Sequence, residues 1–370
     1  MDLGFLSHLY AVSGPYATVY LDTTRGTANA AAQIDLRWRG LRGELAAEGA
    51  DEETLAAIDG VVGADGARGD GQVVVAAQGR VLLDSALAQA PRREGAAWSA
   101  LPNVMPLVAQ TSDVVPYVLV VADRTGADVT AFGSHGEELS TEVEGTGGPH
   151  LTKVNPGGWS QKRFQQRAEN LWEANAGETA RWVSGIAQEI GARLVIGAGD
   201  VRAVTFLRDH LEPPAREIFL AIDEGGRGAG ASEESLERRV AQLVAEAAAH
   251  DALAIIEKFE EERGQGDRAV QGLRATVEAV RRAQVETLVL VDDPSSTALL
   301  YVGPDPVHLA VEADELADLG VTGAQPVRAD AALVRALAAT AADVVVAPAP
   351  LTVTDGVGAV LRYADAATPA

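Results

Sequence analysis

Apolar residues along this chain follow two periods, and the alternation between them predicts an α/β fold. Short runs such as Tyr16–Asp22, Tyr117–Ala122 and Thr287–Asp292 are rich in β-branched and aromatic residues and have the length of buried strands. Other segments repeat apolar residues at intervals of three and four, as amphipathic helices do, and the longest is Ser160–Ile190. Because strands and helices alternate throughout, each third of the chain is expected to form a mixed sheet with packed helices.

The other predicted elements complete this pattern. Further helices are expected over Ala28–Glu48, Glu52–Val62, Val201–His210, Glu233–Arg263, Asp267–Arg282 and Asp330–Ala341. Further strands are expected over Gln72–Ala77, Arg80–Asp84, Ala127–Phe132, Leu139–Val143, Arg193–Ile196, Glu217–Ile222, Ala298–Val302, Val344–Ala347 and Ala359–Tyr363. The segment Ala88–Asp113 holds three prolines and has weak periodicity, so it is expected to connect two domains.

Composition shifts suggest where domains begin and end. A chain of 370 residues has room for two or three domains. Gly225–Ser232, with the sequence GGRGAGAS, has the composition of a flexible linker. We therefore expect an N-terminal α/β domain over 1–112, a middle domain over 113–224 and a C-terminal α/β domain over 232–370. Glycines and prolines gather between Gly145 and Gly158 and predict a long loop that projects from the middle domain.

The charge balance restricts the partners. The chain carries 30 Lys and Arg against 53 Asp and Glu, a formal net charge of −23. Such a charge repels nucleic acids at long range and argues against DNA as a partner. A contact with RNA must come from a local basic cluster that acts within a Debye length of about 10 Å.

The residue types also exclude several kinds of site. The chain has no cysteine, which rules out disulfides, thiolate metal ligands and cysteine nucleophiles. Its six histidines lie far apart, so neither a metal nor a cofactor is expected. No apolar run approaches the roughly 20 residues that span a bilayer, and we expect a cytoplasmic protein that does not bind membranes.

The segment Lys153–Asn170 carries the most informative chemistry. Two adjacent glycines, Gly157 and Gly158, allow close approach to another backbone. Lys162, Arg163 and Arg167 then fall on the first two turns of the predicted helix. The helix dipole disfavours cations there, whereas the phosphates of a nucleic-acid backbone would favour them. The local pattern alone favours a simpler interpretation, an ordinary Asn-Pro-Gly-Gly turn before a solvated helix face. Trp159 is expected either to fold back onto its own domain or to stack on a partner such as a base.

Two motifs in this sequence resemble those of a known family. Gly157–Arg167, with the sequence GGWSQKRFQQR, resembles the catalytic loop and following helix of the archaeo-eukaryotic peptide-chain release factors, where Gly-Gly-Gln precedes an Arg-Phe-x-x-x-Arg helix. Asp355–Tyr363, with the sequence DGVGAVLRY, is similar to the glycine-rich strand near the C-terminus of those factors and of Pelota. The chain is thereby identified as a bacterial member of this family over about 115–363. The resemblance implies a three-domain, release-factor-like architecture.

The departures from the family pattern change the expected activity. Trp159 stands where the family has its Gln, and the nearest glutamine gives the spacing Gly158-x-x-Gln161. That spacing is similar to the motif of the peptidyl-tRNA hydrolase of ribosome quality control. The first domain has neither the Asn-Ile-Lys-Ser element nor the Cys-containing motif that reads stop codons. The resemblance therefore implies hydrolysis of peptidyl-tRNA on stalled ribosomes without codon reading.

The resemblance also assigns roles and partners. The implied catalytic residues are Gly157, Gly158 and Gln161, and the implied RNA-binding residues are Lys153, Trp159, Ser160, Lys162, Arg163 and Arg167. The implied partners are the ribosome, with its A site, ribosomal RNA and peptidyl-tRNA, and, as a further candidate, an elongation-factor-type GTPase.

Alternatives to an enzyme stay open. One is a non-catalytic hibernation factor resembling Balon, which would occupy the A site of an idle ribosome; the tryptophan in the third motif position favours it. Another is a soluble stress protein that has kept the fold and lost the ribosome. The Gly197-Ala-Gly199-Asp200 turn is a weak signal for nucleotide binding, because two glycines between a strand and a helix are commonly only a turn.

Overall fold

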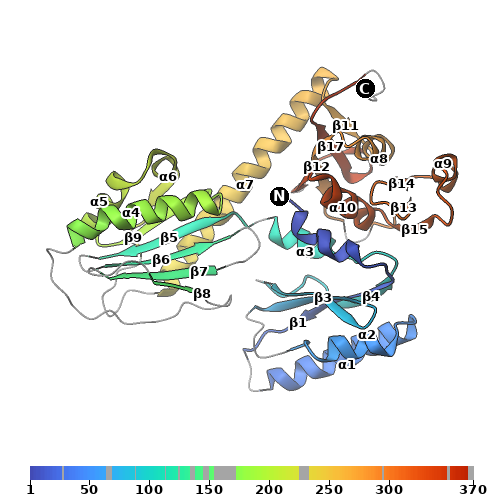
Figure 1. Ribbon diagram of the computed structural model, residues 1–370, viewed down its shortest axis with the longest axis horizontal. Helices are drawn as coiled ribbons and strands as arrows, with labels where there is room; N and C mark the ends of the chain where they lie inside the picture. Colours follow the sequence, from blue (N-terminus) through green and yellow to red (C-terminus); the bar gives the residue numbers. More distant parts are fainter. Residues whose placement is uncertain are drawn as a thin grey trace. The chain divides into compact units, whose positions relative to one another are not determined.

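The computed structural model describes residues 1–370 except 27–28, 64–68, 88, 113, 124–125, 134–137, 145–149, 154–171, 225–232, 294–295, 348–350 and 366–370. The described chain divides into two compact units (Figure 1). Unit 1 combines residues 1–112 with residues 252–370, and unit 2 comprises residues 113–251. Within the described residues, no helix is both long and apolar enough to cross a membrane.

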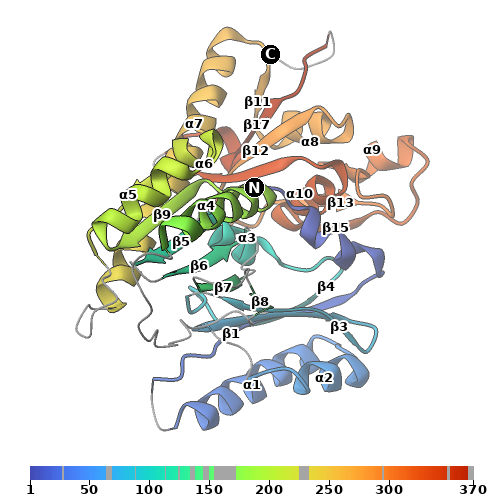
Figure 2. The same ribbon diagram turned by 60° about the vertical axis from the view of Figure 1, so that its left-hand side comes forward.

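The first sheet of unit 1 is a four-stranded antiparallel sheet in the order β3-β2-β1-β4. Helices α1 and α2 lie side by side on one of its faces (Figure 2). Alternate residues of β1 point to opposite faces, so that Val19 packs against these helices while Tyr20 enters the core on the other side. The elements are β1 (Tyr16–Asp22), α1 (Ala30–Ala47), α2 (Glu52–Asp59), β2 (Gly71–Ala77), β3 (Arg80–Leu87) and β4 (Gly95–Ser99).

The rest of unit 1 is built on a four-stranded sheet and a three-stranded sheet. The first has the order β11-β17-β12-β16, in which β12 pairs parallel with β16 and antiparallel with β17. The second has the order β14-β13-β15. The elements are β11 (Ala269–Gln271), α8 (Leu273–Arg281), β12 (Val285–Val291), β13 (Leu299–Val302), β14 (Leu309–Ala310), α9 (Ala313–Asp318), β15 (Gln325–Arg328), α10 (Ala329–Thr340), β16 (Asp343–Ala347), the short η2 (Thr354–Gly356) and β17 (Val357–Leu361).

One hydrophobic core joins the two ends of the chain in unit 1. It contains residues of β1 and β2 together with residues of β12, α8 and α10, and also of η1 (Gly4–Ala11) and α3 (Met105–Thr111). Helix α10 is apolar around nearly its whole circumference and is buried from Ala331 to Ala338. Arg335, the one charged residue in that stretch, donates to the carbonyl oxygens of Gly303 and Pro304.

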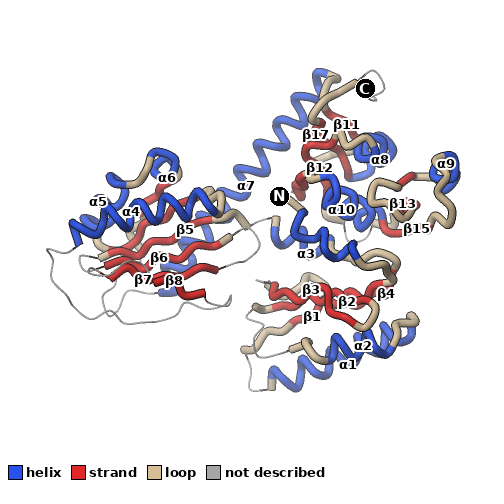
Figure 3. The backbone as a smooth tube through the Cα atoms, viewed as in Figure 1, coloured by secondary structure: helices blue, strands red, loops and turns tan. Residues whose placement is uncertain are grey.

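Unit 2 is a six-stranded mixed sheet with helices on both faces (Figure 3). The strand order is β10-β9-β5-β6-β7-β8, with β5, β9 and β10 parallel. Helices α4, α5 and α6 pack on one face, and the first half of α7 packs on the other. The elements are β5 (Tyr117–Ala122), β6 (Gly126–Phe132), β7 (Glu138–Glu144), β8 (His150–Lys153), α4 (Trp172–Glu189), β9 (Leu194–Gly199), α5 (Val201–His210), α6 (Pro213–Glu217), β10 (Phe219–Ala221) and α7 (Glu233–Gln265).

The predicted α/β class is confirmed, and so are most of the predicted elements. Strand β5 and helix α5 begin and end at the predicted residues. The boundary between the two units falls inside α7, between Asp251 and Ala252. The predicted linker Gly225–Ser232 lies outside the described residues, and the three predicted domains stay a prediction.

Several short elements differ from the prediction. The expected connection Ala88–Asp113 contains β4 and α3; β4 is made mainly of small residues, so its own pattern is weak, and it is held by pairing with β1. Strand β8 lies within the expected long loop. The strand expected from Glu217 begins only at Phe219, because α6 extends to Glu217. The helix expected from Asp267 begins at Leu273, after β11.

Candidate functional site

Most of the residues that the motif assigns to catalysis and RNA binding lie outside the described residues. These are Gly157, Gly158, Trp159, Ser160, Gln161, Lys162, Arg163 and Arg167. Lys153 is the last residue of β8, and its backbone lies opposite Leu139 of β7. The structure therefore defines the two elements to which this segment is attached: β8, at the edge of the six-stranded sheet, and α4.

Helix α4 is firmly fixed to the body of unit 2. Ala180, Val183 and Ala187 are buried at helical spacing and pack on the sheet and on α5. The buried hydroxyl of Ser184 donates to the Ala180 carbonyl at 2.7 Å and accepts the backbone N–H of Glu212 at 3.1 Å. The second half of the helix that follows the motif is thus packed against the body of unit 2.

The glycines of the turn between β9 and α5 have structural roles. Gly199 has a φ of +109°, and a Cβ there would lie 2.1 Å from the carbonyl oxygen of Ala122. A Cβ on Gly197 would lie 2.5 Å from the Phe219 ring. Asp200 caps α5 by accepting the N–H groups of Arg202 and Ala203. Packing and capping therefore account for this Gly-x-Gly-Asp turn without a nucleotide.

The C-terminal motif Asp355–Tyr363 also serves the fold. Asp355 accepts the N–H of Leu273 at 3.0 Å and so satisfies a donor at the start of α8. Gly358 lies against Phe259, since a Cβ at this position would be 2.7 Å from the ring. The guanidinium of Arg362 donates to the Thr340 and Ala341 carbonyls, which end α10. These bonds give Arg362 a structural role.

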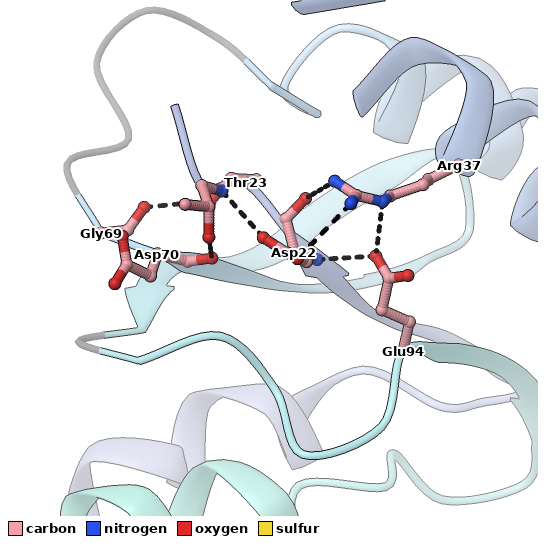
Figure 4. A network of polar contacts seen from close by, with 7 residues as sticks. Asp22, Thr23, Arg37, Gly69, Asp70 and Glu94 are labelled. Carbon is pink, nitrogen blue, oxygen red and sulfur yellow. Dashed lines mark hydrogen bonds and ion pairs between the residues drawn. The ribbon is translucent and has the colours of Figure 1, made fainter. Parts of the chain in front are cut away.

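A polar network organises the loops at the end of β1 in unit 1 (Figure 4). Thr23 bonds through its N–H to the Asp70 carbonyl at 3.0 Å and through its hydroxyl to the Gly69 carbonyl at 3.1 Å. Arg37 lies 3.5 Å from the Asp22 carboxylate and 3.6 Å from that of Glu94. Hydrogen bonds from the Thr24 side chain and backbone, together with the charge of Arg37, hold the pKa of Asp22 below its ordinary value.

Sequence reasoning missed this network because its members come from four separate segments, at residues 22–24, 37, 69–70 and 94. Only the short Asp22-Thr23-Thr24 sequence, which is typical of an Asx turn, gives a local signal. Asp22 and Glu94 both pair with Arg37, so the network acts as a clamp on the loops. Across the residues that the structure describes, no cluster of three or more His, Asp or Glu side chains could bind a metal ion.

Comparisons with known proteins agree with the motif in the middle of the chain. Residues 116–265 match bacterial archaeo-eukaryotic release factor family 2. Two uncharacterized proteins of Mycobacterium tuberculosis, MT2704 of strain CDC 1551 and Rv2629 of strain H37Rv, are each 29% identical over 374 residues. Those alignments cover 97% of this chain and 96% of each relative.

Solved structures of the same group are also similar. Pelota of Archaeoglobus fulgidus is 14% identical, with a TM-score of 0.34, over 98% of this chain and 92% of its own. Dom34 of S. cerevisiae is 11% identical, with a TM-score of 0.37, over 78% and 75%. The family match over the segment that carries the motif confirms the resemblance of this chain to bacterial archaeo-eukaryotic release factors.

Proposed function

We propose that this protein binds ribosomes and hydrolyses peptidyl-tRNA on stalled ones through the Gly157–Gln161 segment, without reading stop codons. The observation that carries the proposal is the Gly158-x-x-Gln161 motif inside the segment that matches release factor family 2. The packing of the second half of α4 on the sheet and on α5 supports it, because a loop that enters a large catalytic site needs a fixed base.

The chemistry defines what each group would do. Hydrolysis of peptidyl-tRNA is the attack of water on an ester, and it needs an oriented water and a donor to the developing oxyanion. A glutamine side chain cannot act as a general base at neutral pH. Gln161 would therefore position the water through its amide, and backbone N–H groups would donate to the oxyanion. The ribosome would supply the remainder of the site, so the free protein should hydrolyse simple esters poorly.

The local charge of this part of the chain supports contact with RNA. Residues 150–216 carry nine Lys and Arg against seven Asp and Glu, a formal charge of 9 − 7 = +2, whereas the whole chain has −23. The other 303 residues therefore carry −25. A less acidic middle segment can approach phosphates at short range while the remaining surface is repelled. Lys153, Lys162, Arg163 and Arg167 would form the phosphate contacts, and Trp159 would stack on a base.

A second function has one observation in its favour. Trp159 replaces the third residue of the family's Gly-Gly-Gln motif. A Balon-like hibernation factor that occupies the A site needs a tight fit there and no positioned water. An elongation-factor-type GTPase is the candidate for delivering the protein in either case.

The test compares peptide release with ribosome binding. Wild-type protein, Gln161→Ala and the matched control Gln165→Ala are mixed with ribosomes that carry a labelled peptidyl-tRNA, and single-turnover release is measured beside cosedimentation. Loss of one positioning donor should slow release by about 10² to 10³ in Gln161→Ala and leave binding nearly unchanged. The control should release peptide at the wild-type rate. If wild-type protein binds and protects these ribosomes but releases peptide no faster than Gln161→Ala, hibernation is the better explanation.

A further inference from the structure

His8, in the last turn of η1, places both of its ring nitrogens against backbone carbonyl oxygens. Its Nδ1 lies 2.7 Å from the oxygen of Phe5, also on η1, and its Nε2 lies 3.0 Å from the oxygen of Leu82 on β3. A carbonyl oxygen can only accept a hydrogen bond, so each contact needs an N–H on the ring. A neutral imidazole has one N–H, whereas the imidazolium has two. The geometry therefore suits the protonated ring.

The Leu82 carbonyl belongs to a β-bulge at the edge of the first sheet. Neighbouring residues of β2 pair with Leu83 and Val81, so the residue between these two, Leu82, is an extra one on β3. The extra residue of a bulge is left out of the regular ladder of hydrogen bonds. The imidazole of His8 contacts its oxygen instead, and thereby joins η1 to an edge strand whose residue lies 74 positions away in the sequence.

The other titratable side chains around η1 have partners of their own, stay neutral or are exposed. They are Tyr10 on η1, Asp2 before it, and, on the two elements that pack most closely against η1, Arg80 and Asp84 of β3 and Asp330 and Arg335 of α10. The three aspartates accept hydrogen bonds from Gly4, Gln72 and Arg328. Burial raises the pKa of Tyr10, Arg335 donates to backbone carbonyls, and Arg80 is exposed. A change of charge here between about pH 5 and 8 therefore comes from His8 itself.

We propose that His8 is a proton-operated clasp that holds η1 on β3, a device separate from the proposed hydrolysis. The protonated ring donates to both carbonyls, and the C-terminal end of a helix favours its charge. When the proton leaves, one nitrogen presents a lone pair to a carbonyl oxygen, and that contact is lost. The folded chain makes two hydrogen bonds to the protonated ring that the unfolded chain does not make. Their contribution is therefore present at the acidic end of the range and is lost as the pH rises.

The test follows the carbonyl carbon of Leu82 by NMR in the isotopically labelled full chain while the pH is raised from about 5 to about 8. Its chemical shift should change together with the shifts of the His8 ring. In His8→Gln the Leu82 carbonyl should not titrate, because an amide has no charge to lose in this range. His210→Gln is the matched control: that ring also contacts a carbonyl, the one of Phe206, but it lies on α5 in unit 2. It should leave the titration of Leu82 unchanged.

Hydrogen exchange measures the strength of the clasp. In the wild type the protection factors of the β3 amides should fall about tenfold between the two pH values, as one charge-assisted hydrogen bond of an exposed ring is lost. In His8→Gln they should be the same at both, with a circular dichroism spectrum like that of the wild type. The proposal is overturned if the Leu82 carbonyl of the wild type does not follow the His8 ring. It is also overturned if His8→Gln keeps the wild-type fall in protection.

Discussion

The first half of α7 should stabilise unit 2 as a part of its core. Leu236, Val240 and Leu243 are buried against the face of the sheet formed by residues such as Leu119 and Ile196. Leu243→Ala tests this, and the same substitution at Leu253 on the same helix is the control. Leu243 is 7% exposed, whereas Leu253 is 52% exposed.

The expected losses of stability differ clearly between the two variants. Truncating a buried leucine to alanine costs about 2 to 5 kcal/mol through lost transfer energy and the cavity left behind. At Leu253 the side chain is half in water already and alanine is the better helix former, so the cost should stay below about 1 kcal/mol. The local free energy of opening of the sheet should therefore fall only in Leu243→Ala.

The assay should read unit 2 locally, because a protein with two compact units need not unfold in a single transition. Hydrogen exchange with mass spectrometry on peptides that cover β5 and β9 meets this need. A loss of 2 kcal/mol or more predicts an acceleration of about 30-fold or more in Leu243→Ala. The reasoning fails if Leu253→Ala accelerates exchange as much, or if exchange in Leu243→Ala matches the wild type.

Two further predictions concern unit 1. Gly358→Ala should destabilise it by about 1 to 3 kcal/mol in urea unfolding, because the new Cβ would lie 2.7 Å from the ring of Phe259, which is fully buried. The control is Gly40→Ala, on α1 with open space around it, which should be neutral or stabilising. An equal loss of stability in both variants would contradict this explanation. Burial raises the pKa of Tyr20 above its ordinary value, and its hydroxyl donates to the Asn103 carbonyl and accepts the Leu107 N–H. The unfolded chain loses the Tyr20 proton at a lower pH than the folded chain does. The contribution of this hydroxyl to the stability of the folded state is therefore complete below about pH 10 and is lost as the pH rises further. Tyr20→Phe should cost about 1 to 3 kcal/mol of stability at neutral pH and should flatten the decline in stability above about pH 10. The measurement is the urea midpoint at neutral pH and above about pH 10. Midpoints equal to those of the wild type under both conditions would refute this prediction.

Local pattern was sufficient for most of the regular elements and for the family motif. In runs such as Tyr117–Ala122 and Val201–His210, neighbouring residues alone show the periodicity and the ends of the element. The observed strand and helix have the same bounds as predicted. The Gly157–Arg167 motif was likewise recognisable from adjacent residues, and its segment matches the family. Elements held mainly by distant pairing, such as β4 and β11, left little local signal and were missed.

The partners of these elements were decided only by the tertiary structure. Periodicity showed that α10 is apolar, but not that it packs in a core shared by residues from both ends of the chain. It showed α7 as one long helix, but not that its two halves enter the cores of different units. The contact between the His8 ring and the Leu82 carbonyl joins residues that lie 74 positions apart. The physical reason is that hydrophobic burial is non-directional: the sequence sets which faces must leave water, and only the packed chain determines what covers them.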